Sequence, residues 1–330
     1  MHQFPSGLID IPPLADCCRL SRRARIPVLL GSRAEDTPLT PMLYDLIRKH
    51  APSRIYEINQ TLFGAMVAET PFWGVYESFP CSNPDCEREL HVLLIDAQMI
   101  EVIDQLVRQL YNLIDGASND LTFRSAKDEE QSRARKILSG LVFRTGNAPV
   151  ITHLPPSNQL PHFWLAEALC VGFAFMVVHE TSHQGPQTLG TEFVSTSIPA
   201  ALRGAAQIGV TLKQEQALAW AKELAADLNA FCIMVTDAQQ SGLREEREND
   251  WYRAFIMGIA LVLKAWDLII EEKCYGEPQY HRRLLRTHPP ARWRINHIAG
   301  NAEQLQRLGM FNGNTGWADR ALDALDDLHR

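Results

Sequence analysis

The chain has 330 residues, of which 46% are hydrophobic and 22% charged, a composition typical of a folded protein with one large domain or two closely associated ones. Its formal net charge of −7 argues against nucleic acid as a partner, because phosphate binding needs a basic surface. The first residues lack the pattern of a signal peptide and the seven cysteines suggest no disulfide framework, so we expect a cytoplasmic protein.

The first half of the chain is expected to mix helices with short strands. A strand-like pattern runs from 54 to 95, where aromatic residues at 72–79 and an apolar run at 90–95 predict an antiparallel hairpin. Two shorter apolar runs, 141–143 and 150–151, flank a Gly-Asn turn and predict a second hairpin. Helices are predicted at 43–49, 99–114 and 127–138.

The second half is predicted to be mainly helical. Its apolar stretches 163–178 and 256–270 are short or carry charged residues, so they predict buried helices and argue against a membrane partner. The segment 185–212 contains several glycines and two prolines and is expected to be a surface connection. Helices are predicted at 161–184, 213–236, 250–272, 290–308 and 317–328.

These elements predict an α+β fold, in which a small antiparallel sheet packs on a mainly helical body. We expect residues 1–150 to form an N-terminal α+β region whose role the sequence does not identify, with recognition of a substrate or partner as the candidate role. Residues 151–330 are expected to form the helical domain that carries the chemistry.

The strongest chemical signal is His179-Glu180-Thr181-Ser182-His183, an H-E-x-x-H pattern. On a helix, histidines four residues apart share a face and can offer two nitrogens to one metal ion. Glu180 would project beside the metal, where it can take a proton from bound water. Zinc is the expected ion, because imidazole suits it and because it lowers the pKa of bound water to about 7.

The surroundings of the motif weigh against a fortuitous match. Residues 163–178 read FWLAEALCVGFAFMVV, a helix that is apolar nearly all round, so the motif ends a buried helix. Burying two histidines and a glutamate without partners would be costly, and a metal ion relieves that cost. A chance match with ordinary core or surface histidines is the alternative.

A catalytic zinc ion needs a third protein ligand and one open position. The metzincin pattern would place that ligand six residues after His183, where this chain has Leu189. A better candidate is Glu223, one helical turn before Asp227 on the same face of a later helix. Glu223 could ligate the ion, and Asp227 could accept the N–H of a bound imidazole and orient it. An ordinary amphipathic helix with a solvated acid pair is the alternative.

Together with the segment THPPARWRI at 287–295, these motifs resemble those of the gluzincin metallopeptidases, particularly the lineage of the CAAX prenyl protease and HtpX. That lineage carries H-E-x-x-H, then E-x-x-A-D, and often T-H-P-x-x-x-x-R-I. The resemblance covers roughly 161–298 and implies a zincin-like body. It implies zinc ligands His179, His183 and Glu223, the base Glu180, and Asp227 behind them. The lineage's membrane helices are missing here. The chain also resembles phage-exclusion proteases of the Lit type, which carry an H-E-x-x-H motif as well.

A hydrogen-bond donor besides the metal should stabilise the negative charge that develops on an attacked carbonyl. The resembled family has its T-H-P segment near the active site, which favours His288 and Arg292 in this catalytic role. A Thr-His-Pro-Pro cap that begins a helix near residue 290 explains the same residues equally well.

The resulting expectation is a zinc-dependent endopeptidase that cleaves a specific intracellular protein, with a regulatory protein partner in addition to the substrate. The substrate could add a strand to an exposed sheet edge at 90–95 or 150–153. A zinc hydrolase of a non-peptide substrate and a non-catalytic, metal-stabilised binding protein are the alternatives. A structural zinc site has four protein ligands, so three ligands and an intact Glu180 favour catalysis.

Overall fold

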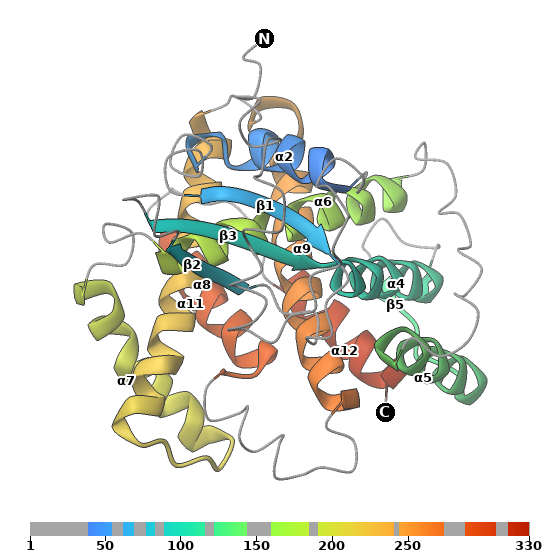
Figure 1. Cartoon of the computed structure of the whole chain (residues 1–330). Coiled ribbons are helices and arrows are strands. Elements are labelled where there is room, and N and C mark those ends of the chain that lie inside the picture. Colours follow the sequence, from blue (N-terminus) through green and yellow to red (C-terminus); the bar gives the residue numbers. More distant parts are fainter. Residues whose placement is uncertain are drawn as a thin grey trace.

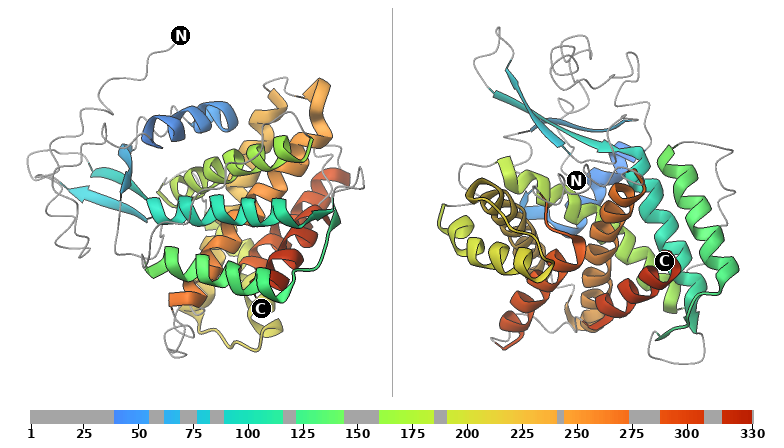
Figure 2. Two further views of the ribbon diagram at one scale, coloured as in Figure 1. Left: turned by 90° about the vertical axis from the view of Figure 1, so that its right-hand side faces the viewer. Right: turned by 90° about the horizontal axis from the view of Figure 1, so that it is seen from below.

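The computed structural model describes residues 39–54, 62–68, 77–82, 89–115, 122–143, 160–184, 191–240, 244–273, 288–307 and 316–329. Its helices are α2 (Leu39–His50), α4 (Ala97–Leu113), α5 (Asp128–Phe143), α6 (Leu160–Gln184), α7 (Thr191–Gln207), α8 (Gln214–Gln240), α9 (Arg244–Lys273), α11 (Ala291–Arg307) and α12 (Gly316–His329). Its strands are β1 (Leu62–Ala68), β2 (Glu77–Ser82), β3 (Glu89–Asp96), β4 (Ile114–Asp115) and β5 (Thr122–Phe123). The helices form the body of the molecule, and the sheet of β1, β2 and β3 lies along one side of it (Figures 1 and 2).

Two apolar helices, α6 and α9, form the centre of the body. Every residue from 171 to 178 of α6 and from 254 to 263 of α9 is buried, as expected for helices that are apolar on all sides. The two helices pack against each other, and α4, α5, α11 and α12 surround α9. One hydrophobic core draws residues from both sides of residue 150, from α2, α4 and α5 and from α6, α8, α9, α11 and α12.

Glycines allow α6 and α9 to approach each other at backbone distance. A Cβ atom added at Gly258 of α9 would meet the backbone oxygen of Ala168 and lie 2.9 Å from the amide nitrogen of Gly172, both on α6. Gly172 faces Gly258 in turn, since its own added Cβ would lie 2.8 Å from the Gly258 carbonyl oxygen. The crossing therefore depends on the missing side chains.

We expect Gly258→Ala to lower the free energy of unfolding by about 1–3 kcal/mol, because the added methyl group forces the two helices apart. Gly300→Ala on α11 is the matched control, since nothing lies within 4 Å of its added Cβ. That change should raise stability by about 0.5–1 kcal/mol through helix propensity alone. Denaturant unfolding with an unchanged m value measures both. Equal stabilisation of the two variants would contradict the tight crossing.

The predicted α+β class is wrong. Among the residues whose side chains are described, 89% are helical and 2% are in strands. The three-stranded sheet is also mixed rather than antiparallel: its order is β1-β3-β2, with β1 parallel and β2 antiparallel to β3. The pattern at 72–95 predicted the β2–β3 pairing, but nothing in it indicated a parallel partner from 62–68. Contacts between long helices form the hydrophobic core, and the sheet lies along one side of the helical body (Figure 1).

The expected surface connection at 185–212 is wrong for most of its length. Residues 191–207 form α7, which continues through Pro199. Ala200, Ala201 and Ala205 of this helix are buried in a second small core with residues of α8. Gly209, with φ of 72°, adopts the left-handed conformation typical of the residue that ends a helix. Packing on α8 therefore outweighs the helix-breaking composition.

The second predicted hairpin is wrong in its first strand. Residues 141–143 end α5, where Val142 is buried in the core. The other strand, 150–151, lies outside the described residues. The remaining helix predictions are confirmed, because each rests on a long periodic pattern. The largest differences are at the start of α9, which begins at Arg244 rather than at 250, and at the end of α5, which ends at Phe143 rather than at 138.

Candidate metal centre

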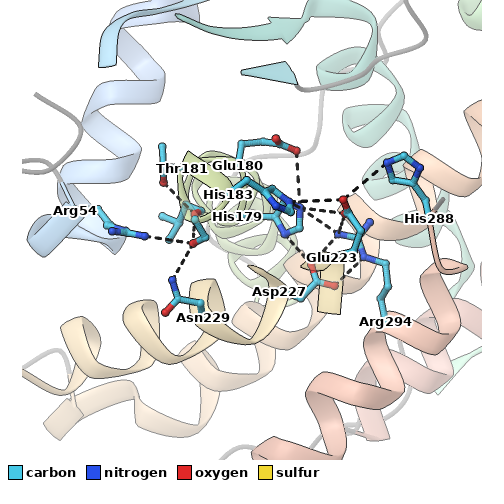
Figure 3. A network of polar contacts seen from close by, with 12 residues as sticks. Arg54, His179, Glu180, Thr181, His183, Glu223, Asp227, Asn229, His288 and Arg294 are labelled. Atoms are coloured by element: carbon cyan, nitrogen blue, oxygen red, sulfur yellow. Dashed lines mark hydrogen bonds and ion pairs between the residues drawn. The ribbon is translucent and has the colours of Figure 1, made fainter. Parts of the chain in front are cut away.

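Three helices bring the chemical motifs to one place (Figure 3). The last turns of α6 carry the H-E-x-x-H motif, and α8 passes beside them with Glu223 and Asp227. The start of α11 adds His288, just before the helix, and Arg294. Elements that are far apart in the sequence thus enclose a single polar cluster inside a largely apolar body.

The ligand atoms of His179, His183 and Glu223 face one another. Nε2 of His179 lies 3.2 Å from Nε2 of His183, and the Glu223 oxygens lie 3.5 Å and 3.7 Å from these two nitrogens. Zinc bonds of about 2.0–2.1 Å in a tetrahedron place neighbouring ligand atoms about 3.3 Å apart. The three side chains therefore have the spacing of zinc ligands. Among the described residues, they form a group of possible metal ligands whose atoms all lie within 4.8 Å.

Asp227 lies at the nitrogen of the His179 ring that faces away from His183, and Arg294 is bonded to Asp227. Nδ1 of His179 lies 2.9 Å from Oδ1 of Asp227, whose carboxylate is fully buried. Arg294 donates from Nε and Nη2 to the two oxygens of Asp227, at 2.8 Å and 2.7 Å. A carboxylate on Nδ1 favours a proton there, so the neutral ring would turn its Nε2 lone pair toward the cluster.

The protonation equilibria of the cluster reflect these contacts. Burial by itself would lower the pKa of His179, but the carboxylates of Asp227 and Glu223 outweigh it and raise the pKa to about 10. Burial prevails at His183 and lowers its pKa to about 4, so this ring is neutral and able to ligate a metal. A proton on His179 thus takes the place of a cation between two carboxylates, and a metal ion would displace it.

The formal charge of the cluster fits a divalent cation. Glu180, Glu223 and Asp227 contribute three negative charges and Arg294 one positive charge, which leaves a sum of −2 once the extra proton has left His179. Burial opposes the negative form of Glu223, yet contact with His179 and the neighbouring positive charges hold its pKa well below the usual range. Uncompensated buried charge is costly, so a divalent ion would stabilise the cluster.

Glu180 lies beside the three ligand atoms without being one of them. Its Oε1 is 3.8 Å from Nε2 of His179, and its side chain is 16% exposed. Figure 3 shows the Glu180 side chain beside His179 and His183, on α6. A carboxylate there can accept a proton from a water molecule at the site.

The structure separates the two donors expected from the T-H-P segment. Nε2 of His288 lies 3.8 Å from Glu223, and burial lowers the pKa of this imidazole. Arg292 instead donates to Asp323 and Asp326 of α12, at 2.9 Å and 2.6 Å. His288 is therefore part of the cluster, and Arg292 is not brought to it.

Arg294 is the residue of the cluster that sequence reasoning missed. Side chains two positions apart in a helix differ by about 200° around its axis, so Arg292 and Arg294 point to opposite sides of α11. Nη2 of Arg294 also lies 3.7 Å from Glu223 and 3.5 Å from Nε2 of His179. The arginine of the T-H-P-x-x-x-x-R-I pattern is Arg294, and this signal could have identified it.

No protein-family model, curated protein or solved structure matches the chain. Within the described part of the chain, no helix has both the length and the apolar character needed to cross a membrane. The inference of function therefore depends on the chemistry of the cluster.

Proposed function

We propose that the chain is a zinc-dependent endopeptidase that cleaves a specific protein. The ion would be held by His179, His183 and Glu223, and Glu180 would act as the general base. The observation that carries the proposal is the spacing of the three ligand atoms, 3.2–3.7 Å, beside a fourth group suited to proton transfer. Two imidazoles and one carboxylate are a ligand set typical of catalytic zinc.

When bound, zinc would lower the pKa of water and polarise a substrate carbonyl. The residues of the chain would do the rest. Glu180 takes a proton from the attacking water and delivers it to the leaving amine. Asp227 keeps the His179 ring oriented, and Arg294 holds that carboxylate ionised. His288 would donate a hydrogen bond to the carbonyl oxygen as negative charge develops on it.

The sheet offers one edge close to this site. The predicted edge at 90–95 lies in β3, which is the central strand of the sheet, and 150–153 lies outside the described residues. β2 is an outer strand and packs against α6, which carries the motif. Pro80 within β2 fits this position, since proline is confined to the edges of sheets. A substrate would add to β2 as an extended strand.

The proposal places the enzyme in the cytoplasm. The spacing of the seven cysteines along the chain suggests no disulfide framework, which supports a reducing compartment. The protein substrate would then be in the same compartment as the enzyme. A regulatory protein partner would control when the substrate is cleaved.

Comparison of protein termini tests the proposal. The zinc-loaded chain is incubated with an extract of cytoplasmic proteins, in parallel with the same chain after removal of zinc by a chelator. We expect new amino termini in one or a few proteins with the loaded chain, none after chelation, and their return when zinc is restored. A chain that binds one zinc ion but produces no new terminus would contradict peptidase activity.

A further inference from the structure

A buried hydroxyl group lies at the back of the H-E-x-x-H motif. Ser182 is fully buried, and its Oγ donates to the carbonyl oxygen of Val178 at 2.7 Å. The same oxygen accepts hydrogen bonds from Asn229 Nδ2 at 3.0 Å and from Arg54 Nη2 at 3.3 Å (Figure 3). One hydroxyl thus joins the motif helix to two other parts of the chain.

Both partners bear on the position of the ligands. Asn229 is two residues beyond Asp227 on α8, so its bond to Ser182 joins α6 and α8 next to the contact between His179 and Asp227. Helix α8 also carries Glu223. The relative position of α6 and α8 decides whether the carboxylate of Glu223 reaches the two imidazoles.

Arg54 comes from the N-terminal part of the chain, just after α2. Its side chain is buried, and Asp237 of α8 provides the nearby negative charge that opposes the effect of burial on its pKa. The backbone nitrogen and the hydroxyl of Ser53 donate to Asp237 at 3.0 Å and 2.7 Å. The turn at 51–54 is thereby attached to α8 while Arg54 reaches α6.

Burying a guanidinium group is unfavourable unless the group is hydrogen-bonded and lies near a negative charge. Here the group lies between the two helices that carry the proposed zinc ligands: its hydrogen bond reaches Ser182 of α6, and its neighbour Ser53 is bonded to Asp237 of α8. Such contacts behind metal ligands orient them and tune metal affinity.

We propose that Arg54 is a positioning residue of the metal centre, which acts through Ser182 to hold α6 and α8 at the separation that zinc requires. This inference rests on the proposed function. It assigns to the N-terminal part of the chain a share in the metal site, in addition to any role in substrate recognition.

A purely structural role would give a different result. Loss of a structural contact lowers the free energy of unfolding but leaves the metal site of the folded molecules unchanged. Loss of a positioning contact changes the coordination of the metal in protein that is still folded. Cobalt in place of zinc reports this directly, because its visible spectrum depends on the geometry of its ligands.

The experiment compares the full-length wild type with Arg54→Met, Arg54→Lys and Ser182→Ala. We expect Arg54→Met and Ser182→Ala to raise the Kd for zinc about tenfold and to shift the cobalt spectrum. Arg54→Lys keeps a buried donor and charge and should remain within about threefold of the wild type. Arg108→Met is the matched control, since it removes an arginine bonded to Asp104 at 2.7 Å on α4 and should change neither measurement.

The outcomes separate the two proposals. A wild type that takes up neither zinc nor cobalt overturns the proposed function, and the role of Arg54 with it. A wild type that binds both metals, with Arg54→Met and Ser182→Ala unchanged in Kd and spectrum, overturns only the role of Arg54. If Arg54→Met does not fold, Ser182→Ala alone decides, because it removes the shared acceptor and little volume.

Discussion

Replacement of Glu180 by glutamine is expected to lower kcat/KM for peptide cleavage about a thousandfold, while one zinc ion per chain remains bound. Glutamine has the size of glutamate but cannot accept a proton from water at neutral pH. Metal binding should persist, because Glu180 lies beside the ligand atoms, with Oε1 at 3.8 Å from Nε2 of His179, and is not one of them. The measurement pairs metal analysis with cleavage of a peptide copied from a newly found terminus.

Glu167→Gln is the matched control for this change. Glu167 lies on the same helix, where Lys49 donates to both of its oxygens at 2.9 Å, and it is remote from the cluster. The control should retain wild-type cleavage. If Glu180→Gln kept full activity on the same peptide, Glu180 could not be the base, and the proposed mechanism would fail.

Glu223→Gln is expected to raise the Kd for zinc at least a hundredfold, more than the effect typical of a group behind the ligands. The substitution keeps the side-chain volume but removes the negative charge and one strong oxygen ligand. It also raises the charge sum of the cluster by one, so a divalent ion is no longer balanced. Glu223 is the one proposed ligand that α8 contributes, so its loss leaves only the two imidazoles of α6.

Thermal stability gives a second measurement of the Glu223 effect. With free zinc at one hundred times the wild-type Kd, binding stabilises the wild type by about 2.7 kcal/mol but a variant with a hundredfold higher Kd by only about 0.4 kcal/mol. Glu130→Gln, which loses a carboxylate bonded to Arg124 at 2.6 Å on α5, should keep the full gain from zinc. Wild-type zinc affinity in Glu223→Gln would show that another group is the third ligand.

The candidate site could be predicted to a large extent because much of it is local. His179 and His183 share a face of one helix, and Glu223 and Asp227 share a face of another, since residues four apart lie on the same side. The apolar run before His179 predicted burial, and the helix is buried there. These properties follow from helix geometry and residue type, without knowledge of the rest of the fold.

The remainder of the site depends on how helices are rotated against one another. Arg292 and Arg294 are equally suitable donors by type, and only the packing of α11 against α8 and α12 decides that Arg294 faces the cluster. Arg54 reaches Ser182 from 128 residues away in the chain, a contact that no local pattern indicates. The fold class was wrong for a related reason, because strand patterns do not reveal how small a share of the structure the strands will form.

By itself, the sequence determined that a buried helix ends in two imidazoles on one face with a carboxylate between them in the chain, and that an acidic pair lies on one face of a later helix. Only the tertiary structure decided that these two faces meet at the spacing of zinc ligands, that Arg294 compensates their charge, and that β2 is an outer strand in contact with α6. The physical reason is that spacing along one helix follows from its own 3.6-residue turn. Contacts between helices follow from the burial of many apolar side chains at once.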